Sequence, residues 1–158
     1  MFSKLQTPAQ LATLRDEFAA AGRKLVFTNG CFDLLHVGHV RYLQAARALG
    51  DALLVAVNGD ASVRALKGPT RPINGEDDRA EVLAALECVS YVTLFHAERV
   101  TDLVRTIRPQ VYAKGGDYTV ESLDSGERGA LLEAGTDIQI LPLVPGKSTT
   151  ATIAKWKS

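Results

Sequence analysis

The sequence has few cysteines, no net charge and no long apolar segment, and each shortage argues against a class of protein. Its two cysteines are not spaced as CxxC, so we expect a reducing, cytoplasmic setting rather than a disulfide scaffold or a cysteine zinc site. Lys plus Arg and Asp plus Glu both number 18, which argues against a general nucleic-acid or membrane-surface binder. The longest apolar run, 52–57, is far shorter than the roughly 20 residues of a transmembrane helix. The polar N-terminus does not resemble a signal peptide.

What the sequence does contain is the composition of a globular domain. Of its 158 residues, 46% are hydrophobic and 23% are charged, which is typical of a chain that buries a full core. It shows no internal repeat, low-complexity tract or linker, so we expect one domain over residues 1–158.

Helical and strand patterns alternate along the chain. A helix is expected to begin with a capping box at Thr7 and Gln10 and to stop at Gly22. The other helices are expected at 36–49, 60–66, 74–86 (capped by Asn74), 100–107, 127–134 and 148–156. Short strands are expected at 25–28, 52–57, 91–95, 111–113 and 138–141. This order predicts an α/β fold: a Rossmann-like open parallel five-stranded sheet with helices on both faces.

Polar and glycine-rich segments follow the first, second, fourth and fifth expected strands. Ligands of open parallel sheets bind beyond the carboxyl ends of the strands, where the strand order reverses. We therefore expect one site assembled from four loops.

Residues 28–39, TNGCFDLLHVGH, hold the densest set of candidate functional side chains. They run from a buried strand through a glycine turn into a helix start, whose free N–H groups favour an anion. His36 and His39 are three residues apart and share one face, while Gly38 lets a flat ring approach the backbone. A phosphate beside a planar base fits this pattern. The two histidines as metal ligands, or as unrelated surface residues, remain alternatives, and the lone His96 is interpreted as structural.

The pattern G-x-F-D-x-x-H-x-G-H resembles the signature of the cytidylyltransferase-like nucleotidyltransferases. Among these, the chain resembles the D-glycero-β-D-manno-heptose 1-phosphate adenylyltransferases over about residues 24–153. Four further segments carry this narrower resemblance: KGP at 67–69, RPIN at 71–74, KGGDY at 114–118 and GKSTT at 146–150. Some members of that family carry a sugar kinase domain on the same chain, and at 158 residues we expect none here.

The resemblance implies that ATP and a heptose 1-phosphate react to give ADP-heptose and pyrophosphate, for lipopolysaccharide or another envelope polysaccharide. The sugar phosphate would attack the α-phosphorus directly, without a covalent enzyme intermediate. The resemblance also implies Mg²⁺ held mainly by the ATP phosphates, no metal site made by the protein alone, and a homodimer. Its partners would be small-molecule substrates, with no nucleic acid and no membrane.

Site residues follow from the matching motifs. The catalytic group would be His36, His39 and Lys67. Nucleotide contacts would come from the glycine turn, the KGGDY loop and the start of the last helix: Asn29, Gly30, Cys31, Phe32, Gly38, Lys114, Gly116, Asp117, Gly146, Lys147, Ser148 and Thr149. The sugar phosphate would contact Asp33, Asn58, Asp60 and Arg71.

Several of these residues also have a simpler interpretation. Lys67 and Arg71 can be solvated surface charges, Asp33 can merely orient its turn, and Asp60 can be a helix N-cap. The adjacent Asp78 and Arg79 can be a site pair or a surface pair. GKSTT is not a P-loop, because that pattern needs glycine at position 141, which is leucine.

Leu143 and Lys147 depart from the related patterns. Glycerol-phosphate enzymes carry a phosphate-binding arginine where this chain has Leu143, and heptose enzymes usually have an uncharged residue at the Lys147 position. Lys147 either supplies the missing charge or points to water. Two other functions therefore stay open: a cytidylyltransferase acting on glycerol 3-phosphate or another polyol phosphate, and a non-catalytic nucleotide-binding regulatory module.

Overall fold

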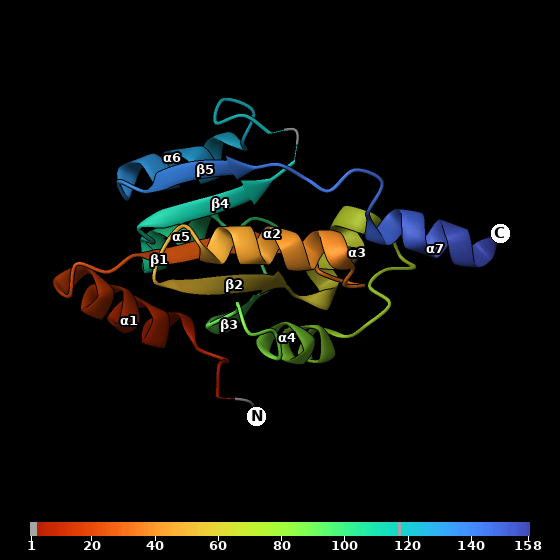
Figure 1. Cartoon of the computed structure of the whole chain (residues 1–158), viewed down its shortest axis with the longest axis horizontal. Helices are drawn as coiled ribbons and strands as arrows, with labels where there is room; N and C mark the ends of the chain where they lie inside the picture. Colours follow the sequence, from red (N-terminus) through yellow and green to blue (C-terminus); the bar gives the residue numbers. More distant parts are fainter. Residues whose placement is uncertain (1–2, 117) are drawn as a thin grey trace.

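A computed structural model describes residues 3–116 and 118–158, which form a parallel sheet flanked by helices (Figure 1). The sheet has five strands: β1 (Leu25–Gly30), β2 (Ala52–Asn58), β3 (Tyr91–Phe95), β4 (Val111–Gly115) and β5 (Asp137–Leu141). Their order is β3-β2-β1-β4-β5, and every neighbouring pair is parallel. The winding therefore reverses beside β1, and the carboxyl ends of β1 and β4 meet where such sheets bind ligands.

Helices cover both faces of the sheet. Helices α1 (Pro8–Ala20), α5 (Thr101–Ile107) and α6 (Ser125–Glu133) contribute to one buried apolar cluster. Helices α2 (Val37–Arg47) and α4 (Glu76–Ala84) contribute to the other. Every residue of β2 is buried, as expected for a central parallel strand covered on both sides. The α/β fold and the five strands predicted from the sequence are confirmed.

Two helices border the carboxyl edge of the sheet. Helix α3 (Asp60–Lys67) follows β2 almost directly. Helix α7 (Thr149–Lys157) ends the chain and projects away from the sheet in Figure 1. None of the side chains of α7 is buried. Within the described residues, none of the helices is both long enough and apolar enough to cross a membrane.

The structure confirms one local prediction and corrects two others. The capping box of Thr7 and Gln10 is present at the start of α1. Lys114 and Gly115, expected in a loop, instead extend β4, where they pair with Ile140 and Leu141 of β5. The predicted cap Asn74 was wrong: Gly75 is the N-cap of α4, because the Asn74 side chain donates to the Asp33 carbonyl oxygen instead.

Candidate active site

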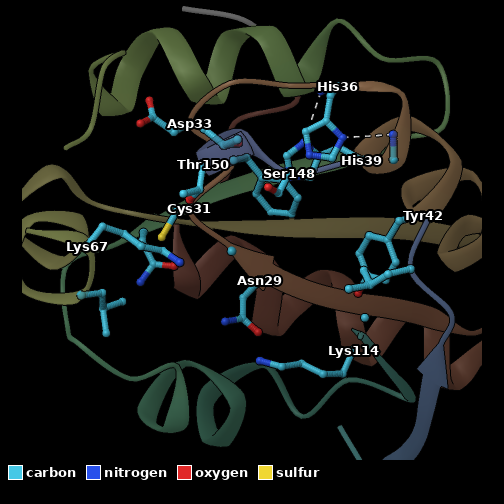
Figure 2. Close-up of a pocket in the computed structure, with 18 of the residues that line it drawn as sticks. Asn29, Cys31, Asp33, His36, His39, Tyr42, Lys67, Lys114, Ser148 and Thr150 are labelled. Atoms are coloured by element: carbon cyan, nitrogen blue, oxygen red, sulfur yellow. Dashed lines mark hydrogen bonds between the residues drawn. The ribbon is translucent and has the colours of Figure 1, made fainter. Parts of the chain in front are cut away.

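A cavity of about 540 Å³ opens at the carboxyl ends of β1, β2 and β4 (Figure 2). It is lined by most of the residues predicted from the sequence: Asn29, Gly30, Cys31, Phe32, Asp33, His36, Gly38, His39, Asn58, Lys67, Arg71, Lys114, Lys147, Ser148 and Thr149. Asp60, Gly116 and Gly146 are not among the lining residues, and Asp117 lies outside the described residues. Residues far apart in the sequence therefore converge on one space, as expected for a site at a strand-order reversal.

His36 and His39 form the start of α2. The Nδ1 atom of His36 accepts from the Gly38 N–H at 3.1 Å, and the Nδ1 atom of His39 accepts from the His36 N–H at 3.3 Å. An Nδ1 atom that accepts a hydrogen bond carries no proton, so each neutral ring carries its proton on Nε2. Both rings line the cavity and have Nε2–H donors for a ligand.

Burial keeps both imidazoles uncharged near neutral pH. Desolvation, and then the charge of His36, lower the pKa of His39 to about 4. Desolvation, and then the nearby charge of Lys147, lower the pKa of His36 below its usual value of 6.5. A bound polyphosphate would supply the negative charge that favours the protonated rings.

Gly30 and Gly38 allow the rings of this turn to pack closely. A Cβ atom on Gly38 would lie 2.8 Å from Cε1 of His36. A Cβ atom on Gly30 would lie 2.9 Å from Cε2 of Phe32, whose backbone is left-handed with a φ of 47°. The Phe32 ring in turn meets His39 edge-on, with centroids 5.4 Å apart. Glycine is therefore needed at both positions so that the Phe32 and His36 rings can pack against the backbone.

Asp33 fastens the RPIN loop to this turn. Its carboxylate accepts from the backbone N–H groups of Ile73 at 2.9 Å and Asn74 at 3.0 Å, and from Nε of Arg71 at 2.7 Å. Burial raises its pKa, but these hydrogen bonds outweigh burial and hold the pKa below its usual value. Asp33 is only 3% exposed, and Figure 2 shows its carboxylate turned away from His36. Its contacts support the orienting role, while Arg71 keeps its terminal guanidinium nitrogens for a ligand.

Arg79 lies beneath the turn and joins three segments. Its side chain is fully buried and donates to the Cys31 carbonyl oxygen at 2.6 Å, the Asn74 carbonyl oxygen at 2.9 Å and Oδ1 of Asp60 at 2.8 Å. Of the two possibilities left open for Arg79, the surface pair is therefore wrong. Asp60 serves as the partner of Arg79, and Gly59, not Asp60, is the N-cap of α3.

His96 extends this network away from the cavity. Its Nε2 atom lies 2.9 Å from Oε1 of Glu76, and Oε2 of Glu76 accepts from the Asp60 N–H at 2.6 Å. The His96 side chain is 66% exposed, and it does not line the cavity. These contacts support the structural interpretation of His96.

Cationic side chains line the same cavity as the histidine pair. Lys67 and Arg71 approach from α3 and the following loop, and Lys147 precedes α7. Ser148 is the N-cap of α7, and Thr149 Oγ1 donates to the Leu34 carbonyl oxygen at 2.9 Å, which ties this helix to the histidine turn. Cationic side chains, two imidazole donors and a helix start therefore line one cavity, which suits a polyphosphate.

Sequence reasoning missed several lining residues. Tyr42 follows His39 by three residues on the same helix, so helical spacing would have found it. Its hydroxyl donates to the Ala113 carbonyl oxygen at 2.9 Å, and burial raises its pKa to about 12. Its ring lies beside Gly115 and Leu143, forming an apolar wall. Glu98, Arg99 and Glu127 also line the cavity, and no motif marks them.

Among the described residues, no group of three or more His, Cys, Asp or Glu side chains is placed to hold a metal ion.

Comparison with known proteins places this geometry in a family. The family described as "Cytidylyltransferase-like" matches residues 27–152. The chain is 49% identical over 154 residues to "Bifunctional protein HldE" of Trichlorobacter lovleyi, covering 97% of this chain and 31% of that protein. It is 48% identical over 156 residues to the protein of the same name from Geotalea uraniireducens, covering 99% of this chain and 31% of that protein.

A solved structure shares the fold. It is described as the lipopolysaccharide core biosynthesis protein from Thermoplasma volcanium, is 29% identical in sequence and superposes with a TM-score of 0.64. The match covers 78% of this chain and 98% of that one. The chain thus spans nearly all of this solved structure but under a third of the two bifunctional relatives.

Proposed function

Since the chain belongs to the cytidylyltransferase-like family, we propose that it transfers the adenylyl group of ATP to D-glycero-β-D-manno-heptose 1-phosphate. The products are ADP-heptose and pyrophosphate, and the pathway served is lipopolysaccharide biosynthesis. Similarity at 44–50% identity to bifunctional HldE proteins supports the sugar, although the chain spans 31% or less of their length. The lipopolysaccharide core protein from Thermoplasma volcanium supports the pathway.

One observation carries the chemistry: two uncharged, stacked histidines at a helix start, surrounded by cations, at one end of a cavity large enough for two substrates. Phosphate oxygens accept hydrogen bonds from the Nε2–H groups of His36 and His39. Lys67, Arg71 and Lys147 balance the charge of the triphosphate and the sugar phosphate. The start of α7 adds its backbone dipole.

The reaction is an in-line displacement at the α-phosphorus. A phosphate oxygen of the sugar 1-phosphate forms the new P–O bond, and the bond from the α-phosphorus to the bridging oxygen of the β-phosphate breaks. The bond's electron pair leaves with pyrophosphate. Negative charge therefore grows on the leaving group, where the histidines and Lys147 stabilise it more strongly in the transition state than in bound ATP. Positioning and electrostatics supply the catalysis, because no protein nucleophile is needed.

Mg²⁺ accompanies ATP in this proposal. The phosphates supply most of the ligands to the ion. Asp33 is already engaged by three protein donors, and among the described residues no three His, Cys, Asp or Glu side chains group as a metal site. When bound, Mg²⁺ neutralises phosphate charge.

The protein works as a homodimer in the cytoplasm in this proposal. Cytoplasmic ATP and the two cysteines, which form no disulfide, suit that compartment. Trp156, 72% exposed on α7, offers apolar surface for a second copy, which light scattering of the purified protein tests.

A pyrophosphate-release assay tests the reaction. Purified protein is given ATP or CTP with either anomer of the heptose 1-phosphate, or with glycerol 3-phosphate. Turnover with ATP and the β-anomer that exceeds every other combination is expected. Preference for CTP with glycerol 3-phosphate would replace the proposal with a polyol-phosphate cytidylyltransferase. Tight ATP binding without turnover in any combination would indicate a regulatory module.

A further inference from the structure

A largely buried carboxylate in the cavity wall has no hydrogen-bond or ion-pair partner among the described residues. Glu127, the third residue of α6, is only 6% exposed, and it lines the cavity. Its backbone N–H is held by Asp124 Oδ1 at 3.1 Å, which fixes where the side chain starts. Among the described residues, no donor lies within hydrogen-bond or ion-pair distance of the Glu127 carboxylate oxygens. The Glu127 oxygens are not among the fully buried side-chain polar atoms that lack a partner. The carboxylate thus reaches the cavity, where a ligand can donate to it.

Asn29, which is oriented by Tyr112, offers a hydrogen-bond donor in the same cavity as this carboxylate. Burial, and then the negative charge of Glu127, raise the pKa of Tyr112 well above its usual value, and Asn29 and Glu127 both line the cavity. The Tyr112 hydroxyl donates its proton to Oδ1 of Asn29 at 2.8 Å, and that proton is therefore not available to Glu127. The same bond orients the Asn29 amide, whose Nδ2 group has no acceptor among the described residues. The cavity therefore has an unused acceptor at Glu127 and an unused donor at Asn29.

Charge decides which part of a ligand fits here. The Glu127 carboxylate repels a phosphate that touches it, so the groups that bind at Glu127 itself are not anionic, even with Lys114 beside Asn29. In Figure 2, His36 lies on one side of Asn29, and Lys114 lies on the other. A neutral group that donates to a carboxylate and accepts from an amide matches Glu127 and Asn29. A sugar hydroxyl does both.

We propose that Glu127 and Asn29 form a subsite that recognises the hydroxyl groups of a sugar ring. The inference rests on the proposed function, which brings two such rings into the cavity: the ribose of ATP and the heptose of the sugar phosphate. Ring hydroxyls donate to the Glu127 carboxylate and accept from Nδ2 of Asn29. Glu127 is thus a specificity residue that accepts hydrogen bonds from sugar hydroxyls and does not contact the phosphates.

The test compares Glu127→Gln and Glu127→Leu with Glu133→Gln. Glu133 is the last residue of the same helix, and its side chain is 70% exposed, so its variant controls for charge loss on α6. Calorimetry measures the dissociation constants of ATP, 2′-deoxy-ATP and 3′-deoxy-ATP. Binding of heptose 1-phosphate is measured with a non-hydrolysable α,β-methylene ATP already bound. Thermal midpoints show whether each variant is folded.

We expect Glu127→Gln to weaken binding of one substrate by about 10-fold, since hydrogen bonds to charged groups are worth roughly 1.5–3 kcal/mol. Glu127→Leu should weaken it further, and Glu133→Gln should change nothing. If ribose is the ligand, one deoxy-ATP binds wild type and Glu127→Gln equally well. If heptose is the ligand, only heptose 1-phosphate binding weakens.

Unchanged dissociation constants for both substrates would overturn the subsite. So would equal losses for ATP and both deoxy analogues together with unchanged heptose 1-phosphate binding, because then no ribose hydroxyl is being read. Wild-type turnover is scored separately in the pyrophosphate assay. Hydroxyl-dependent binding without turnover would refute the proposed reaction but support the subsite. Turnover without hydroxyl-dependent binding would support the reaction but refute the subsite.

Discussion

The imidazole rings of His36 and His39 are stacked, with centroids 3.9 Å apart and planes inclined by 28°. Backbone N–H groups of the same turn donate to the Nδ1 atom of each ring, so both rings keep this arrangement without a ligand. Two positive charges this close would repel each other, and after burial the charge of His36 helps to lower the pKa of His39. The pair is therefore a pre-oriented set of neutral donors.

Replacing His39 with alanine should reduce turnover more than it weakens ATP binding. The reason is that its contact strengthens as charge moves to the leaving pyrophosphate. We expect kcat to fall by about 100-fold or more, within the range for loss of one transition-state donor, with His36→Ala acting similarly. Steady-state kinetics and ATP calorimetry measure the two effects. Near-normal turnover in both variants would rule out this role for the histidines.

Acid should destabilise the fold partly through His39. Its folded pKa of about 4 lies below its ordinary 6.5, so the unfolded chain takes up the proton first as pH falls. The contribution of His39 to the free energy of unfolding is thus fully present above about pH 6.5, and it is lost as the pH falls toward about 4. Urea unfolding across this window should show a steeper decline for wild type than for His39→Gln. Parallel curves would contradict the assigned pKa shift.

A methyl group at Gly38 should damage the site while leaving the fold intact. The added Cβ would meet the His36 ring at 2.8 Å and the Lys147 Cβ at 3.2 Å, so the imidazole must turn away. We expect Gly38→Ala to lower kcat/KM by about 10-fold or more, roughly 1.4 kcal/mol of transition-state stabilisation.

Gly129→Ala is the matched control, since nothing lies within 4 Å of its added Cβ in helix α6. It should keep full activity and gain about 0.5–1 kcal/mol of stability. Equal kinetics for both variants would show that His36 tolerates displacement.

Replacing Arg79 with methionine should cost stability and activity together. The change leaves Asp60 and the Cys31 and Asn74 carbonyl groups without their buried donor. A buried acceptor left without its donor costs about 1–3 kcal/mol, whereas the Asp60 side chain is 33% exposed and remains solvated. We therefore expect a loss of about 3 kcal/mol from urea unfolding. Arg64→Met, at an exposed position of α3, should stay within about 0.5 kcal/mol of wild type. A loss for Arg79→Met no larger than this control would show that the network is dispensable.

Lys147 should contribute to catalysis through its charge. It lines the cavity close enough to His36 to lower the pKa of that residue, and Leu143 leaves the neighbouring position uncharged. We expect Lys147→Ala to lower kcat/KM for ATP by about 10-fold, with Lys147→Arg recovering part of the loss. Lys155 is exposed on α7, and Lys155→Ala should leave kcat/KM for ATP unchanged. Kinetics of Lys147→Ala that match wild type at low and high ATP would show a side chain directed to water.

The fold and the histidine turn are predictable from the sequence because their signals are local. The all-apolar segment 52–57 indicates a strand buried on both sides, and the histidine spacing indicates one helical face. The predicted superfamily is confirmed by the family match over residues 27–152. The nucleotide, catalytic and sugar-phosphate roles of individual residues stay predictions, which the variants above test.

Other site features depend on tertiary position and leave no local signal. Arg79 reads as half of a surface pair with Asp78, because only the packing of α4 under the histidine turn buries it. Glu127 reads as an ordinary acid in the first turn of a helix, since its placement requires α6 to lie behind β1 and β4. Asn74 reads as a helix cap, and the competing acceptor is 41 residues earlier, at Asp33.

Helix α7 closes the phosphate end of the cavity, yet none of its side chains is buried. Its side-chain tie to the histidine turn is the hydrogen bond from Thr149 to the Leu34 carbonyl oxygen. Segments with few buried contacts open at a small fraction of the global unfolding free energy. Helix α7 is therefore expected to open locally at a lower free-energy cost than the sheet. If the triphosphate contacts Lys147 and Ser148 as proposed, its binding would stabilise this helix, so substrate occupancy would contribute to the order of the site.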